Sequence, residues 1–231
     1  MKSNPVIVAL DFESAEAARQ VVESLGDAIS IYKVGLELYA AAGMGFAREL
    51  IERGKQVFLD LKLYDIGETV KRATARVAES GVHFLTVHGN KAIMRAAAEG
   101  RGSSGLKLLA VTVLTCLDQD DLVELGYPCT VTDLVGLRVR NAVEVGMDGI
   151  VCSPLEVAAV RALAPRAILI TPGVRSAGAG KGDQKRVATP AEAIRAGADY
   201  IVVGRQITRA PDPRQEALKI LGEIEGARSH C

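Results

Sequence analysis

Short apolar runs alternate with longer polar stretches along this chain, and this alternation restricts its fold more than any other feature. The runs are rich in Val, Ile and Leu and short enough to be buried strands. They are Val6–Asp11, Ile31–Gly35, Val57–Leu63, Phe84–His88, Leu108–Leu114, Gly149–Cys152, Ala167–Thr171 and Tyr200–Gly204. The stretches with helical periodicity include Ser14–Leu25, Ala40–Arg53, Thr69–Ser80 and Pro190–Ala196. Strands that alternate with helices pair in parallel, so the sequence predicts an α/β protein.

The simplest closure of eight such strands is a (β/α)8 TIM barrel. A chain of 231 residues with 48% hydrophobic content fits one barrel, so we expect a single domain over residues 1–231. An open doubly wound sheet is the alternative, because the pattern cannot show that the first strand meets the last. The long segment between Cys116 and Met147 predicts an extra helix before the regular one.

Charge and cysteine usage exclude several classes of protein. The 28 basic and 28 acidic residues cancel, so no overall field favours nucleic acid or an anionic membrane, and no stretch is long enough to span one. The cysteines lie far apart without a C-x-x-C pair, which argues against zinc and disulfides. His83 and His88 would face opposite sides of a strand, so we interpret them as structural or rim residues. We expect a soluble cytoplasmic protein without a metal site.

The third apolar run carries two charges on one face. Side chains alternate along a strand, so Phe58, Asp60 and Lys62 share one face while the opposite face of Val57–Leu63 is entirely apolar. In a barrel the apolar face packs on the helices. Asp60 and Lys62 therefore point inward near the carboxyl end of the strand, where barrel enzymes keep their active sites. Each buried charge needs a partner.

Three more charges lie at equivalent positions. Asp11 ends the first run, Lys33 lies within the second, and Asp65 follows the third. For any one of these residues alone, a buried ion network that only stabilises the barrel is as good an interpretation as function. Because all five charged residues lie near the carboxyl ends of strands, we favour an active site.

The last two apolar runs are followed by glycine and arginine. Thr171–Arg175 and Val202–Arg205 occupy the positions where barrels commonly bind phosphate. Glycine lets backbone N–H groups approach an anion, and arginine offers a planar fork for its oxygens. We expect Arg175, Gly204 and Arg205 to bind such a group. A surface loop is the alternative interpretation, and it suits residues 178–181 better than the two arginines that directly follow strands. The Thr115 hydroxyl has two equal interpretations, contacting a ligand or satisfying loop backbone.

The run Asp60-Leu-Lys-Leu-Tyr-Asp-Ile-Gly-Glu-Thr69, together with Lys33-Val-Gly, resembles the orotidine 5'-phosphate decarboxylase family. Its D-x-K-x-x-D element is shared with sugar-phosphate decarboxylases and synthases of the same suprafamily. The later motifs appear in the order of the decarboxylase family, so the resemblance spans nearly the whole chain. They are Val111–Thr115, Thr171–Arg175, Gly182–Gln184 and Val203–Thr208.

The resemblance implies a cofactor-independent decarboxylation of orotidine 5'-phosphate to uridine 5'-phosphate in de novo pyrimidine biosynthesis. Lys62 would donate a proton to C6 of the pyrimidine, and Lys33, Asp60 and Asp65 would complete a charged tetrad. Asp11 with Lys33 would hold the ribose hydroxyls. The other ligand-binding residues that the resemblance implies are Gln184, Arg205 and the backbone at Gly204 for the phosphate, with Arg175 and Thr115 lining the site.

The resemblance also implies a homodimer in which Asp65 and Thr69 reach the site of the neighbouring subunit. Residues 176–184 are predicted to form a lid. The chain departs from the common bacterial pattern outside the tetrad, with Tyr64 in place of His, Gly67-Glu68 in place of Pro-Asn, and Gln206 in place of Pro.

Two alternatives remain open on sequence alone. A magnesium-dependent sugar-phosphate decarboxylase or aldolase would carry the same D-x-K-x-x-D element, but usually has an acidic residue at the position of Lys33. A non-catalytic nucleotide-binding barrel could retain Arg175, Gln184 and Arg205 for phosphate. It would have no reason to keep five charges at the mouth.

Overall fold

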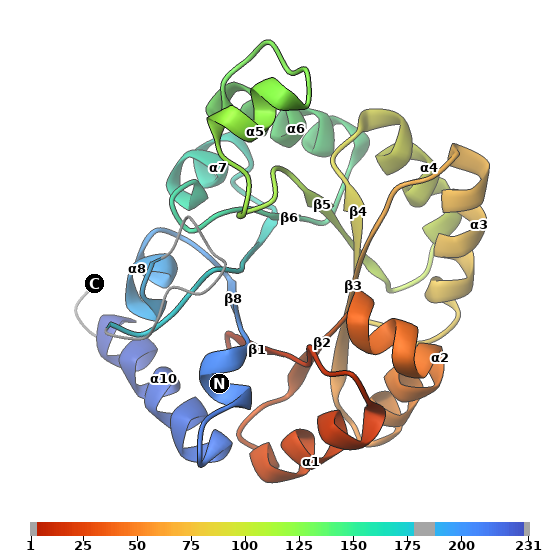
Figure 1. Ribbon diagram of the computed structural model, residues 1–231. Helices are drawn as coiled ribbons and strands as arrows, with labels where there is room; N and C mark the ends of the chain where they lie inside the picture. The colour runs from red at the N-terminus through yellow and green to blue at the C-terminus, as the bar shows by residue number, and fades with distance from the viewer. Residues whose placement is uncertain (1–3, 178–187, 229–231) are drawn as a thin grey trace.

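Eight parallel strands close into a barrel in the computed structural model, which describes residues 4–177 and 188–228 (Figure 1). The ring is closed between β1 and β8, where Val6 pairs with Ile201 and Val8 with Val203. The strands are β1 Val6–Ala9, β2 Ile31–Gly35, β3 Gln56–Leu63, β4 Phe84–His88, β5 Lys107–Val111, β6 Gly149–Val151, β7 Ile168–Thr171 and β8 Tyr200–Val203. The predicted (β/α)8 barrel is confirmed, and the open sheet is wrong.

Helices surround the barrel on its outer side (Figure 1). They are α1 Ala15–Leu25, α2 Leu36–Glu52, α3 Gly67–Ala78, α4 Lys91–Arg101, α5 Gln119–Glu124, α6 Val131–Val145, α7 Val157–Leu163, α8 Pro190–Arg195, α9 Arg205–Thr208 and α10 Pro213–Arg228. The expected extra helix is α5, which precedes α6 and lies outside the ring. Side-chain caps start several helices. Ser14 accepts a hydrogen bond from the Ala17 N–H at 3.2 Å, and Thr189 forms a capping box with Glu192.

Several predicted element boundaries differ from the structure, and the largest differences are in the second helix and the fifth strand. The second helix begins at Leu36 rather than Ala40, because Gly35 caps it directly after β2, and Gly43 interrupts it with a φ of 61°. That positive φ suits glycine, and the apolar periodicity around it does not reveal the break. The fifth strand ends at Val111 rather than Leu114, so Thr115 lies in the loop that follows it.

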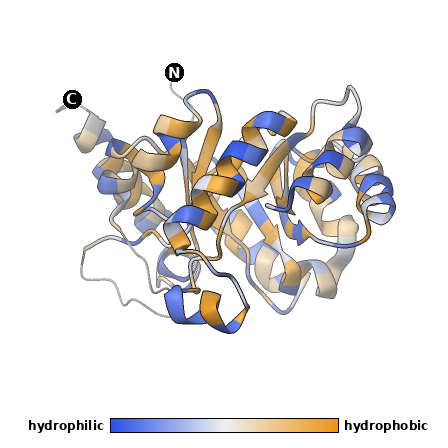
Figure 2. Cartoon of the chain, turned by 90° about the horizontal axis from the view of Figure 1, so that it is seen from above, coloured by the Kyte–Doolittle hydropathy of each residue, from blue (hydrophilic) through white to orange (hydrophobic). Residues whose placement is uncertain are grey.

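The hydrophobic core has two layers. One lies between the strands and the helices and contains alternate strand residues such as Val8, Val57 and Leu59. The other fills the inside of the barrel and consists of Ile7, Ala9, Ile31, Phe58, Phe84, Leu109, Val111, Val151, Ile170 and Val202. In Figure 2 the strands are mainly hydrophobic and the helices carry both kinds of residue. The inside of the barrel is therefore a packed core rather than a pore.

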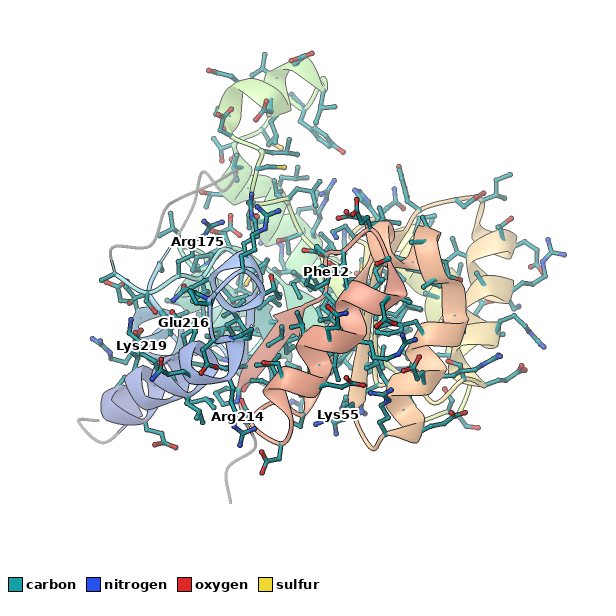
Figure 3. All side chains as sticks on the ribbon, turned by 60° about the horizontal axis from the view of Figure 1, so that its bottom comes forward. Phe12, Lys55, Arg175, Arg214, Glu216 and Lys219 are labelled. Carbon is teal, nitrogen blue, oxygen red and sulfur yellow. The ribbon has the colours of Figure 1, made fainter. Side chains whose placement is uncertain are left out.

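The two ends of the barrel differ in what their polar side chains do. At the amino end, Lys55 donates to the carbonyls of Gly26 and Ile29, and Arg214 donates to the carbonyl of Leu25. Figure 3 shows Lys55 and Arg214 at the end opposite Arg175. At the amino end of the barrel these polar side chains therefore bind backbone carbonyls, whereas the carboxyl end of the barrel contains the cavity. No helix among the described residues is long and apolar enough to cross a membrane.

Candidate active site

A cavity of about 400 Å³ opens at the carboxyl ends of the strands. This volume lies in the usual range for small-molecule sites. The charged and polar side chains that line it, with the glycines, are Asp11, Lys33, Asp60, Lys62, Thr115, Cys116, Cys152, Gly173, Arg175, Gly204, Arg205 and Gln206. The strand alternation predicted that the charges of the first three strands would meet, and the structure brings them together.

The charges at the carboxyl ends of the first three strands form a chain of alternating sign. Lys33 Nζ lies 2.8 Å from Asp11 Oδ1 and 3.8 Å from Asp60 Oδ2, while Lys62 Nζ lies 2.9 Å from the same Asp60 oxygen. The side chains of Lys33 and Asp60 are only 12% and 13% exposed. Each buried charge therefore has an opposite charge beside it, which offsets the cost of its desolvation. The Asp60 carboxylate lies between two ammonium groups.

Lys62 is held in an unusual backbone conformation. Its φ is 49°, and among the described residues it is the only non-glycine with a positive φ. The pairing of β3 with β4 shifts register between Leu59 and Leu63, so Lys62 lies in a bulge. Both Asp60 and Lys62 still face the cavity as predicted, but not through regular alternation. Bulges and strained residues gather at functional sites, where they re-aim a side chain.

Gly35 leaves space for the pair formed by Lys33 and Asp11. A Cβ atom at Gly35 would lie 2.9 Å from Lys33 Nζ and 3.0 Å from Asp11 Oδ1. Any larger residue would have to displace one of these charged atoms. The glycine of the Lys33-Val-Gly run is therefore needed for steric reasons, because it leaves room for the ion pair between Lys33 and Asp11.

Asp65 and Thr69 lie outside the cavity of their own chain. Both are exposed, and neither is among the residues that line it. Asp65 accepts a hydrogen bond from the Ile66 N–H at 2.6 Å, in the turn that leads into α3. One chain thus brings together the four charges of the cavity, whereas Asp65 and Thr69 of the same chain lie outside it.

The rim beside β3 is formed by stacked rings. Tyr64 stacks on His88 with ring centroids 4.3 Å apart and planes inclined by 27°. Burial lowers the pKa of His88 below its ordinary value of 6.5, and the positive charge of Arg138 acts in the same direction. His83 packs edge-on against Phe84, and burial lowers its pKa as well. Both histidines are therefore neutral at pH 7, in keeping with structural or rim roles.

The opposite wall carries the residues expected to bind phosphate. Arg175, Gly204 and Arg205 all line the same cavity as Lys62. Gln184 lies outside the described residues, as does most of the predicted lid over 176–184. At the base of that segment the Arg175 N–H donates to the Ala188 carbonyl at 3.0 Å.

A polar network that the sequence did not reveal holds Ser176. The Gln206 side-chain oxygen accepts from the Ser176 N–H at 3.0 Å, and its amide nitrogen donates to Ser176 Oγ at 2.9 Å and to Glu216 at 2.7 Å. The Ser176 hydroxyl donates to Glu223 at 3.0 Å. In the sequence alone, Gln206 is visible only as a departure from a family pattern. In the structure it ties the residue after Arg175 to α10, on the side of the barrel where Figure 3 labels Arg175 and Glu216.

No metal-binding cluster is formed by the part of the chain that the structure describes. No group of three or more His, Cys, Asp or Glu side chains there is arranged to hold a metal ion.

Comparison with known proteins points to one family. The model described as "Orotidine 5'-phosphate decarboxylase / HUMPS family" matches residues 4–220. A protein of Caulobacter sp. (strain K31) named orotidine 5'-phosphate decarboxylase is 52% identical over 228 residues, which cover 98% of this chain and 100% of the relative. A protein of the same name from Nitrobacter winogradskyi is 53% identical over 223 residues, covering 96% and 93%.

Solved structures show the same similarity. A crystal structure of orotidine 5'-phosphate decarboxylase from Lactobacillus acidophilus superimposes with a TM-score of 0.83 at 35% identity, covering 96% of this chain and 99% of the other. An uncharacterized conserved protein from Geobacillus kaustophilus gives a TM-score of 0.81 at 33% identity, covering 95% and 100%.

Proposed function

The chain belongs to the orotidine 5'-phosphate decarboxylase family, which acts in pyrimidine biosynthesis, and we propose that it decarboxylates orotidine 5'-phosphate without a cofactor. In this proposal Lys62 is the proton donor. The observation that carries this proposal is the position of Lys62. Its ammonium group lies 2.9 Å from Asp60, inside a cavity that also contains Arg175 and Arg205. One cavity therefore holds both a proton source and cationic groups for a phosphate.

The chemistry requires a positive charge close to the reacting carbon. When the bond from C6 to the carboxylate breaks, its electron pair stays on C6 in an orbital within the ring plane, where the ring cannot delocalise it. Each tenfold gain in rate needs about 1.4 kcal/mol of stabilisation specific to the transition state. A fixed ammonium supplies such stabilisation with little reorganisation. Lys62 then gives its proton to C6 and recovers one from water.

Asp60 has two roles in this proposal. At 2.9 Å it stabilises the positive charge of Lys62 and fixes the direction of the ammonium group. Its own negative charge also repels the substrate carboxylate, and this repulsion disappears when neutral carbon dioxide leaves.

The remaining lining residues bind the unreactive parts of the nucleotide. Asp11 with Lys33 binds the ribose hydroxyls, and Arg175, Arg205 and the Gly204 backbone bind the phosphate. Thr115 lines the same cavity. We assign Gln184 to the phosphate by family resemblance alone. The binding energy of the phosphate, which is remote from the reacting carbon, holds the substrate in position next to Lys62.

We further propose a homodimer in which Asp65 and Thr69 complete the neighbouring active site. The support is their exposure and their place outside their own cavity. Exposed apolar side chains lie beside them, with Tyr64 64% and Ile66 77% exposed, as a subunit contact would require. The balanced charge and scattered cysteines support a cytoplasmic enzyme without nucleic-acid or membrane partners.

Turnover is expected to survive removal of divalent metal ions. The purified protein should decrease the ultraviolet absorbance of orotidine 5'-phosphate at an unchanged rate after dialysis against EDTA, because the proposed mechanism uses only protein charges. A known magnesium-dependent enzyme treated in parallel shows that the chelation worked. Loss of turnover that magnesium restores would instead support the sugar-phosphate enzyme class, and absence of turnover under all conditions would support a binding protein.

Gln206→Ala is expected to weaken substrate binding. The substitution removes three hydrogen bonds that hold Ser176 and Glu216, so the residue that follows Arg175 loses its support. Each hydrogen bond contributes about 0.5–1.5 kcal/mol, and water replaces part of what is lost. We therefore expect KM to rise roughly 3- to 30-fold, with a smaller change in kcat. Steady-state kinetics measure both. Gln215→Ala, at an exposed glutamine of α10, should change neither. An unchanged KM for Gln206→Ala would show that the network does not support the phosphate site.

A further inference from the structure

Thr86 lies beneath the two residues at the centre of the proposed reaction. It is in the middle of β4 and is completely buried. Its Oγ1 accepts a hydrogen bond from the Lys62 N–H at 2.9 Å and donates one to Asp60 Oδ1 at 2.9 Å. It is not among the residues that line the cavity.

The direction of both hydrogen bonds is fixed by the groups involved. A backbone N–H can only donate, so the Thr86 oxygen must accept from Lys62. A carboxylate oxygen can only accept, so the single hydroxyl proton must point to Asp60. The two oxygens of Asp60 are thus divided. Oδ1 faces the Thr86 hydroxyl, while Oδ2 lies 2.9 Å from Lys62 Nζ and 3.8 Å from Lys33 Nζ.

The Thr86 hydroxyl also occupies the place where the strand pairing is interrupted. Leu59 pairs with Leu85 and Leu63 with Val87, so the bulge around Lys62 lies opposite Thr86. A regular ladder would give the Lys62 N–H a carbonyl partner from the neighbouring strand. In the bulge, with φ at 49°, that N–H is satisfied by the Thr86 side chain instead. One hydroxyl therefore stabilises the bulged backbone of Lys62 and the orientation of the Asp60 carboxylate together.

We propose that Thr86 is a positioning residue, which holds Lys62 and Asp60 in the arrangement that protonates C6. The proposal rests on the function given above and deepens it. Because Thr86 does not line the cavity, it acts only through the Lys62 backbone N–H and the Asp60 carboxylate. It should therefore affect the transition state, in which the Lys62 charge is used, much more than it affects nucleotide binding.

The test uses two substitutions that separate the hydroxyl from the shape of the side chain. Thr86→Val keeps the volume and removes the hydroxyl, whereas Thr86→Ser keeps the hydroxyl and removes a methyl group. Thr74→Val is the matched control, since Thr74 is equally buried but lies on α3. The measurements are kcat and KM for orotidine 5'-phosphate, the Kd of the product uridine 5'-phosphate, and the melting temperature.

Thr86→Val is expected to lower kcat about 10- to 100-fold, the loss that corresponds to one hydrogen bond to a charged group and a disturbed bulge. KM and the product Kd should stay within about threefold, which a general loss of folded structure would not produce. Thr86→Ser should keep at least roughly a third of the wild-type kcat, and Thr74→Val should match the wild type.

Equal kcat values for the valine variant and the wild type would overturn the proposal. So would a serine variant as impaired as the valine variant, because the methyl group would then matter rather than the hydroxyl. If Thr86→Val does not fold, Thr86→Ala replaces it in the comparison with serine, and equal kcat values for those two would count against the proposal. Failure of the proposed function is seen separately, as absence of turnover in the wild-type protein.

Discussion

Lys62→Ala should abolish decarboxylation while the protein still binds nucleotide. We expect kcat to fall by at least about 10⁴-fold, because the substitution removes both the proton donor, worth roughly 10²–10⁴, and a fixed charge that stabilises the carbanion, worth a further 10²–10³. The Kd of uridine 5'-phosphate should change only a few-fold, since Arg175 and Arg205 remain. Single-turnover absorbance measurements and calorimetric titration measure the two quantities.

Lys71→Ala is the matched control for this variant. Lys71 forms an ion pair with Glu99 at 3.0 Å, with both side chains substantially exposed, and such pairs contribute little to stability. That variant should turn over substrate at the wild-type rate. Near-normal turnover by Lys62→Ala would remove Lys62 from the mechanism and leave Lys33 as the other lysine of the charged chain.

Asp65→Asn should be almost inactive alone, yet it should regain activity when it is mixed with Lys62→Ala. In the proposed dimer each site takes Lys62 from one subunit and Asp65 from the other. A mixed dimer therefore contains one site with both substitutions and one site with neither. Random assortment makes half of the dimers mixed, so about one quarter of the wild-type activity should return. The activity is measured after the two inactive proteins are unfolded and refolded together.

A second mixture serves as the control for subunit exchange. Asp60 and Lys62 line the same cavity of one chain, so Asp60→Asn mixed with Lys62→Ala should regain no activity through sharing. Equal recovery in both mixtures, or no recovery in either, would contradict the role of Asp65 in the neighbouring site. Asp65→Asn with wild-type kcat would exclude Asp65 from the reaction altogether.

Much of the fold was predictable because its signals are local. Alternating apolar runs and helical stretches indicated the strands and helices of the barrel, and residue parity placed Asp60 on its inner face. Lys62 was expected on the same face and lies there, but a bulge rather than regular alternation turns it inward. The charges at Asp11 and Lys33 were expected at equivalent positions of the first two strands. All four line one cavity in the structure. The predicted start of the second helix at Ala40 was wrong for a similar reason. The local pattern around Ala40 did not indicate that α2 starts at Leu36 or that it is interrupted at Gly43.

The parts of the site that the sequence did not reveal depend on contacts between distant segments. Thr86 resembles any other residue of a buried strand, and its importance comes from the bulge of β3 that lies opposite it. Gln206 was visible as a departure from a pattern, but its partners Ser176 and Glu216 come from two other segments. Hydrogen bonds between residues far apart in the chain produce no periodic pattern in the sequence, so they cannot be predicted from it.

The sequence by itself determined the strand and helix alternation, the inward face of each charged strand and, through motif order, the family. These properties follow from side-chain parity and from residues close together in the chain. Only the tertiary structure decided that β1 meets β8, that Lys62 adopts a φ of 49°, and that Thr86 joins its backbone to Asp60. Those features arise where separate strands meet, because the buried polar groups of a bulge must find partners across the sheet.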